Sequence, residues 1–198
     1  PVGTGDQIYL SSASGGTAGG VAFADEDILL YNKTSGAYSL YFDGSDVGLG
    51  ANNNQDIDAF DLRADGSILL SIIGDTTLPV IGAVDDSDIV RFIPISLGTT
   101  TTGTWSIYFD GSDVGLTTTA EDVDALNVLN DGSIILSTAG NHSVTGVSGN
   151  DEDLLRFVPT STGATTSGTW SIYFDGSDVG LNNATSEQVN AVWVHPNG

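Results

Sequence analysis

The sequence contains no cysteine and no methionine, and only four of its 198 residues are lysine or arginine. Without cysteine, the chain cannot form disulfides, zinc–thiolate sites or iron–sulfur clusters, and it has no cysteine nucleophile. Its 26 acidic residues give a formal net charge of −22, which excludes the basic surface that nucleic acids require. The apolar runs are far shorter than the ~20 residues that span a bilayer. We therefore expect no nucleic-acid partner and no membrane insertion.

Signatures of catalysis and of helices are also missing. The two histidines, His142 and His195, do not recur in the repeat described below. The sequence has no phosphate-binding glycine loop, no G-x-S-x-G elbow and no H-E-x-x-H motif. No stretch shows the i, i+3, i+4, i+7 apolar pattern of an amphipathic helix. These absences predict a β-rich protein that is not an enzyme.

What the sequence does contain is a threefold repeat of about 66 residues. The nonapeptide YFDGSDVGL occurs unchanged at Tyr41–Leu49, Tyr108–Leu116 and Tyr173–Leu181. An acidic cluster precedes each copy, and a second acidic segment follows it. These segments are Asp25–Tyr31, Asp86–Phe92 and Asp151–Phe157, then Gln55–Phe60, Glu121–Leu126 and Glu187–Val192. The repeat predicts one domain, 1–198, with units at about 7–66, 67–132 and 133–198.

Each unit is predicted to contain four strands, separated by polar turns. In their clearest copies these strands cover about 133–138, 153–158, 104–109 and 123–129. The run Ile134–Leu136 is apolar on both faces, which predicts that sheets cover the strand on both sides. The pairs Asp65-Gly66 and Asp131-Gly132 are typical of two-residue hairpin turns, because Asp-Gly tolerates positive φ.

The two ends of the chain carry offset strands. Gln7–Ser11 matches 67–71, and Val189–His195 matches the strand that precedes that position. In circular repeat folds, this offset lets the first strand complete the last sheet, as in β-propellers. We therefore predict an all-β fold of three propeller-like, four-stranded repeats, with the N-terminal strand closing the last unit. A β-trefoil or prism-like threefold fold is the alternative, and three units alone, six from two chains, or part of a longer array remain open.

Aspartates recur near the start, the end and the start of successive strands, positions that meet at one edge of an antiparallel meander. Carboxylate oxygens without histidine or cysteine suit calcium. Side-chain turns, or an acidic surface suited to high salt, are the other interpretations. The third unit has Gln188 and Asn190 in place of its last acidic pair, which predicts weaker binding there. The candidate ligands are Asp25, Asp27, Asp43, Asp46, Asp56, Asp58, Asp86, Asp88, Asp110, Asp113, Asp122, Asp124, Asp151, Asp153, Asp175 and Asp178.

The motifs at Tyr41–Leu49 and Asp151–Phe157 resemble the acidic, β-propeller-like tandem repeats of large secreted bacterial surface proteins. The resemblance covers nearly the whole chain and implies an extracellular or cell-surface, calcium-associated module, but it supplies no functional residues to transfer. We accordingly expect a structural or interaction module of a cell-surface, adhesive or filament-like assembly. Its expected partners are copies of itself or other surface proteins. The alternative is a glycan-binding module of a larger secreted protein.

Overall fold

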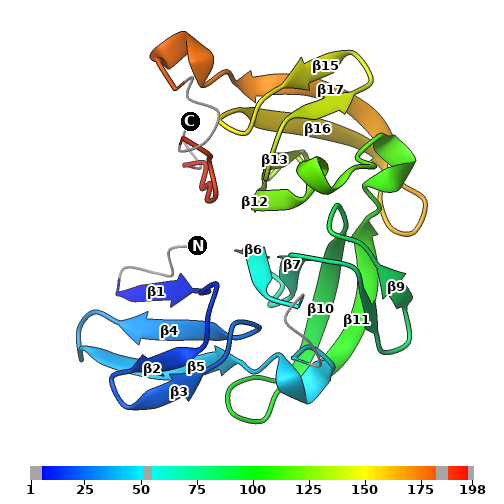
Figure 1. Ribbon diagram of the computed structural model, residues 1–198. Coiled ribbons are helices and arrows are strands. Elements are labelled where there is room, and N and C mark those ends of the chain that lie inside the picture. Colours follow the sequence, from blue (N-terminus) through cyan, green and yellow to red (C-terminus); the bar gives the residue numbers. More distant parts are fainter. Residues whose placement is uncertain (1–5, 51–54, 182–186, 196–198) are drawn as a thin grey trace.

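The computed structural model describes residues 6–50, 55–181 and 187–195 and shows an all-β protein (Figure 1). These residues contain no α-helix, and none of their elements is a helix that could cross a membrane. The helical elements are short 3-10 turns, η1 (Ser45–Val47), η2 (Ser112–Val114), η3 (Thr119–Glu121) and η4 (Ser177–Val179). The predicted β-rich, nearly helix-free class is confirmed.

Three antiparallel sheets make up the body of the protein, with the strand orders β1-β4-β5, β11-β10-β7-β6 and β12-β13-β16-β17. Their strands are β1 (Gln7–Leu10), β4 (Ile28–Asn32), β5 (Ala37–Phe42), β6 (Ile57–Leu62), β7 (Ile68–Ile72), β10 (Ile89–Ser96), β11 (Thr102–Phe109), β12 (Val123–Val128), β13 (Ile134–Thr138), β16 (Leu154–Ser161) and β17 (Ser167–Phe174). The strands predicted from the clearest copies are all present.

Each sheet is accompanied by a short hairpin that the sequence analysis did not predict. The hairpins pair β2 (Gly16–Ala18) with β3 (Val21–Phe23), β8 (Thr76–Leu78) with β9 (Gly82–Val84), and β14 (His142–Val144) with β15 (Val147–Gly149). Three residues are too few to show a period of two, so these strands look like loop in the sequence.

The three sheets follow one another along an arc, with β1, β6 and β12 toward its middle (Figure 1). Each four-stranded sheet takes its innermost strand from the end of the preceding sequence unit, since β6 pairs with β7 and β12 pairs with β13. The two complete sheets therefore span 57–109 and 123–174. Their limits are shifted by one strand from the units defined by the sequence.

The sequence predicts that the two chain ends pair within one chain or across two chains, and within one chain this pairing is not formed. β1 pairs with β4, and residues 187–195 carry no strand. The first sheet therefore has three strands, and the arc stays open between β1 and the C-terminal segment (Figure 1). Tyr9 and Val192, from these two segments, line a common cavity of about 300 Å³ together with Ala59 and Ala125. The segments lie near one another but do not close the last sheet.

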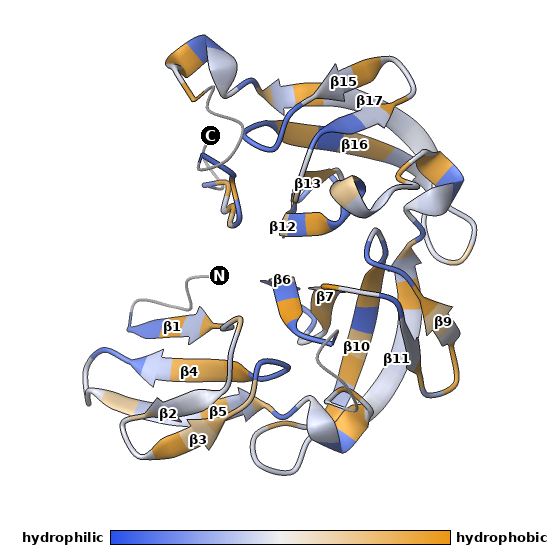
Figure 2. Cartoon of the chain, in the orientation of Figure 1, coloured by the Kyte–Doolittle hydropathy of each residue, from blue (hydrophilic) through white to orange (hydrophobic). Residues whose placement is uncertain are grey.

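The hydrophobic core lies between successive sheets, and its apolar residues concentrate on the strands (Figure 2). On β7, Ile68 and Leu70 belong to a cluster with Phe42 of the first sheet, whereas Leu69 belongs to a cluster with Leu136 of the third. All of these side chains are fully buried. Adjacent residues of one strand point to opposite faces, so the prediction of central strands covered on both sides is confirmed.

The turns at Asp65-Gly66 and Asp131-Gly132 differ from the expected two-residue hairpins. Only their glycines have positive φ, of 86° and 84°. In the first turn the loop is closed by a hydrogen bond from Arg63 N to Ser67 O, 2.9 Å long, and the Asp65 carboxylate accepts the Ser67 N–H at 3.0 Å. Aspartate therefore acts as a side-chain acceptor, and glycine alone supplies the left-handed conformation.

Candidate functional site

The last acid of each acidic cluster holds two turns together. Asp27 accepts the backbone N–H groups of Ala24, at 2.8 Å, and of Gly44, at 3.0 Å. A Cβ at Gly44 would meet the carbonyl oxygen of Glu26, so only glycine allows this approach. The other units repeat this arrangement around two further buried acids, Asp88 and Asp153.

The repeated nonapeptide forms a compact segment, which we call the plug, at Tyr41–Leu49, Tyr108–Leu116 and Tyr173–Leu181. Each plug passes through a 3-10 turn and ends it on a glycine with φ near +100°. Its first aspartate accepts a hydroxyl hydrogen bond from the serine two residues later. These bonds are Asp43 to Ser45 at 2.7 Å, Asp110 to Ser112 at 2.8 Å and Asp175 to Ser177 at 2.6 Å. The side-chain turn considered for this motif is therefore present.

The first plug packs against the next unit at Ser96–Trp105, which we call the socket and which comprises the end of β10, the connecting loop and the start of β11. Asp46 Oδ2 accepts the Thr101 N–H at 2.8 Å, and the Trp105 indole N–H donates to Val47 O at 3.0 Å. The Thr101 hydroxyl in turn accepts from Asp43 N at 3.0 Å. Three hydrogen bonds thus join six polar atoms of the plug and the socket.

The second plug makes the same joint with the socket Ser161–Trp170. Asp113 Oδ2 accepts the Thr166 N–H at 2.8 Å, and the Trp170 indole N–H donates to Val114 O at 3.0 Å. The sequence analysis missed the sockets. Their signal is a shared pattern, Ser-x-Gly-x-x-Thr-x-Gly-x-Trp, which occurs in the second and third units only.

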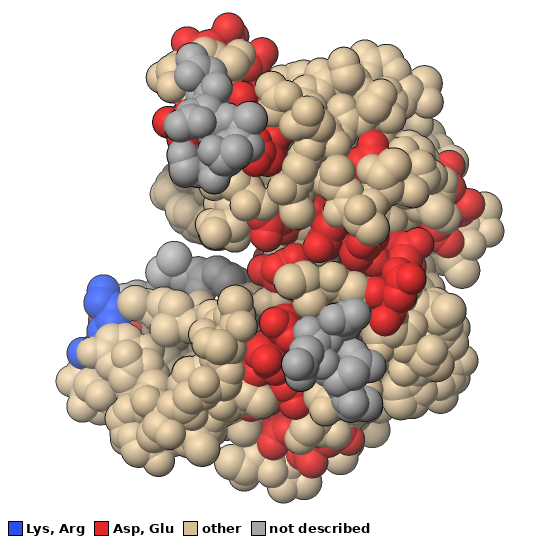
Figure 3. Space-filling view, viewed as in Figure 1, with Lys and Arg blue, Asp and Glu red and all other residues tan. Residues whose placement is uncertain are grey.

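Seven of the predicted ligands gather where the inner strands begin, and we call them the acidic band. They are Asp25, Asp56, Asp58, Asp86, Asp122, Asp124 and Asp151. In the space-filling view, acidic side chains collect in the middle of the molecule, where β6 and β12 lie (Figure 3). Asp58 and Asp122 share a side-chain hydrogen bond. One oxygen each of Asp56, Asp122 and Asp124 is buried without a hydrogen-bond partner.

Proton affinity in the acidic band is strongly increased. Burial, reinforced by the neighbouring Asp58 and Asp86 charges, raises the pKa of Asp122 to about 8. Burial and the Asp124 charge raise the pKa of Asp58 to about 6. Burial, followed by the Asp151 charge, also raises the pKa of Asp124. The band therefore retains at least one proton near neutral pH unless a cation replaces it.

The structure divides the sixteen predicted ligands into three groups. Three of them hold turns, six belong to plugs and seven form the acidic band. Among the residues that the structure describes, no three acidic or histidine side chains come together in an arrangement that holds a metal ion. Asp122 and Asp124, which are 7% and 8% exposed and have an unpartnered oxygen each, are the residues whose chemistry best fits a cation.

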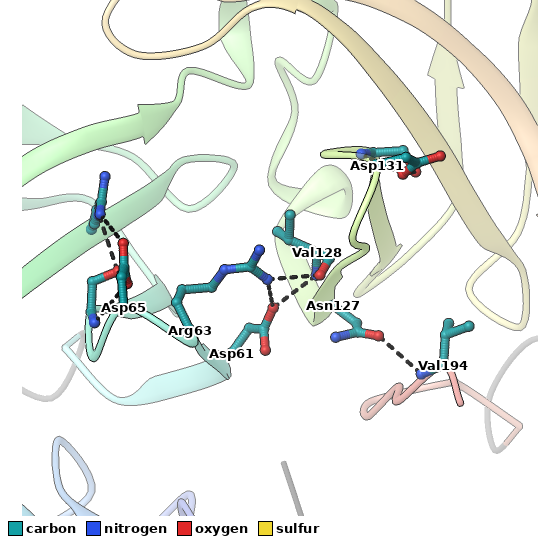
Figure 4. A network of polar contacts seen from close by, with 10 residues as sticks. Asp61, Arg63, Asp65, Asn127, Val128, Asp131 and Val194 are labelled. Carbon is teal, nitrogen blue, oxygen red and sulfur yellow. Dashed lines mark hydrogen bonds and ion pairs between the residues drawn. The ribbon is translucent and has the colours of Figure 1, made fainter. Parts of the chain in front are cut away.

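A polar network links the opposite ends of the inner strands (Figure 4). Asp61 Oδ2 accepts the backbone N–H of Val128 at 2.8 Å, and Arg63 Nη1 donates both to Asp61 Oδ2 and to Val128 O, each at 2.7 Å. One position further along the arc, Asn127 Oδ1 accepts the N–H of Val194 at 2.9 Å. β6 therefore contacts β12 in the same way that β12 contacts the C-terminal segment, residues 187–195.

Comparison of the chain with known protein families and with curated proteins finds no match. The internal repeat is therefore the evidence on which a functional assignment rests.

Proposed function

We propose that the chain is a non-enzymatic, extracellular repeat module that serves as a structural or interaction element of a cell-surface, adhesive or filament-like assembly. Its three units are propeller-blade-like, and partners are recruited through the same kind of contact that joins one unit to the next. The observation that carries this proposal is the joint between units. The most strongly repeated residues, those of the plugs, join neighbouring units in the two joints within the chain.

The proposed location is tested on cells of the source organism. Antibodies against the chain should label intact, unpermeabilised cells, and permeabilisation should add little signal. Labelling that appears only after permeabilisation would overturn the proposal. The control is an antibody against a cytoplasmic protein, which should not label the same intact cells.

We further propose that calcium stabilises the module by neutralising the acidic band. The support is chemical, since buried carboxylate oxygens of Asp122 and Asp124 lack hydrogen-bond donors and calcium prefers oxygen ligands. An ion that binds only the folded state raises the melting temperature with its concentration. Millimolar calcium should therefore raise the melting temperature at pH 7.5, and Asp124→Asn should reduce the gain. The exposed Asp178→Asn is the matched control, and an unchanged melting temperature at moderate ionic strength would refute calcium binding.

A further inference from the structure

The third plug has no socket among the described residues, although its sequence is identical to that of the other two plugs. Its turn η4 stands apart from the neighbouring sheets (Figure 1). Val179 is 66% exposed, whereas Val47 of the first plug is 9% exposed. Tyr173 is 43% exposed, whereas Tyr41 of the first plug packs against a core. The third plug thus forms the same 3-10 turn as the other two plugs, but no socket of the described residues binds it.

The sheet behind this plug is uncovered at the positions that the other joints bury. Ile89 and Phe109 of the second sheet are fully buried against the third sheet. The equivalent residues of the third sheet, Leu154 and Phe174, are both partly exposed. These apolar positions are therefore buried between the second and third sheets but partly exposed to solvent on the outer face of the third sheet.

Residues 187–195 already occupy the place of the next inner strand. Val189 N donates to Asp151 O at 3.0 Å, and Val189 O accepts from the hydroxyl of Ser137. The earlier inner strands make the same contacts, which are Ile57 N to Asp25 O at 3.2 Å, Val123 N to Asp86 O at 3.1 Å and Ser71 Oγ to Val123 O at 2.6 Å. Unlike those strands, residues 187–195 have no further strands of a sheet paired with them among the described residues.

Trp193 occupies the position from which the earlier inner strands contact the next one. Its counterparts Asp61 and Asn127 are 6% and 8% exposed, and both accept a backbone N–H from the following inner strand. Trp193 is 49% exposed. Its ring packs edge-on against His195 and lines a cavity with Arg63 and Asn127, so among the described residues Trp193 accepts no backbone N–H from a following strand.

A second copy of this chain offers no free socket. The sockets of its second and third units are already filled by plugs of the same chain. In its first unit, a short turn at 33–36 joins β4 to β5 and lacks the socket pattern. The third plug therefore has no place to bind on a second copy of this chain.

We propose that the face formed by Leu154, Tyr173, Phe174 and Val179 binds a further unit of the same repeat whose outer loop carries a free Ser-x-Gly-x-x-Thr-x-Gly-x-Trp socket. This partner places its first strand beside 189–195, and its socket receives the third plug. The inference rests on the proposed function as an interaction module and adds the identity of the partner and the direction in which an assembly grows.

The test extends the 198-residue chain by one unit after Gly198. One protein carries a second copy of residues 67–132, which contain a socket, and the matched control carries a second copy of 7–66, which do not. With the socket-bearing unit, amide exchange at Trp193, whose counterpart Asn127 pairs with Ile135 of the adjoining strand, should become about tenfold slower, the effect expected of one additional buried hydrogen bond. Asp178→Ala should abolish this protection. Equal exchange in the two extended proteins would overturn the proposal.

A second measurement uses the 198-residue chain and does not depend on the extension folding. Val179→Asp should leave its melting temperature unchanged, whereas Val47→Asp, at a filled joint, should lower it. Sedimentation should show a monomer, because a second copy has no free socket. Loss of stability in Val179→Asp, or self-association that this variant abolishes, would refute the inference. These outcomes are separate from surface labelling, which alone decides the proposed location.

Discussion

Replacing Asp122 with asparagine should stabilise the protein at neutral and alkaline pH. In the folded state the pKa of Asp122 is raised to about 8 from an ordinary value of 3.8. The folded protein therefore keeps a proton that the unfolded chain releases, and its stability falls as the pH rises from about 4 to about 8. Each pKa unit corresponds to about 1.4 kcal/mol.

At pH 7 this difference corresponds to a cost of up to about 4 kcal/mol. The figure is an upper limit, because Asp58 and Asp122 are hydrogen-bonded and take up the proton as a pair. The asparagine variant is neutral at every pH and avoids this cost. It should be more stable than the parent by about 2–4 kcal/mol at pH 7, and nearly equal to it at pH 4.

The assay is urea unfolding between pH 4 and pH 8 with a chelator present, so that no divalent cation replaces the proton. The pKa of His142 is lowered by burial, so its titration also changes the free energy of unfolding. Such contributions are the same in parent and variant and cancel when the two free energies are subtracted. Asp178→Asn, at an exposed acid of the same charge, is the matched control. If Asp122→Asn is no more stable than the parent at pH 8, ionisation of Asp122 does not destabilise the folded protein and the reasoning is refuted.

Three further substitutions test the joints and the core. Trp105→Phe removes the indole donor from Val47 O and should cost about 1–2 kcal/mol, measured by urea unfolding; an unchanged midpoint would contradict the joint. Ser71→Ala leaves the carbonyl of Val123 without its buried hydroxyl donor and should lower stability by about 1–3 kcal/mol; equal melting temperatures would refute this. Gly103→Ala places a Cβ against neighbouring backbone and ring atoms, so a loss of about 1–3 kcal/mol is expected from overpacking, and a neutral result would show that the site relaxes.

Two of these substitutions have a matched control that makes the same chemical change at a position where the structure gives no such hydrogen bond. The controls are Trp193→Phe for Trp105→Phe and Ser39→Ala for Ser71→Ala, both at exposed positions. Their stabilities should stay within about 0.5 kcal/mol of the parent, as is usual for surface substitutions.

The sequence by itself determined the class of fold and the position of the main strands. The runs Ile68–Leu70 and Ile134–Leu136 are apolar on both faces, so they had to lie between two layers, and both are fully buried. The threefold repeat and the lack of helical periodicity follow from local patterns of the same kind. The short hairpins were not predicted, because strands of three residues are too short to show a period of two.

Only the tertiary structure decided where the acids go and which strand completes which sheet. Asp27, Asp46 and Asp122 all stand in repeat positions that are acidic in at least two units. Yet Asp27 holds two turns, Asp46 accepts an N–H from the next unit, and Asp122 is buried beside another carboxylate. A repeat has no intrinsic starting point, so the sequence could not show that β6 pairs with the unit that follows it. These outcomes depend on contacts between residues far apart in the chain, such as Thr101 with Asp46, and such contacts exist only once the sheets have packed against one another.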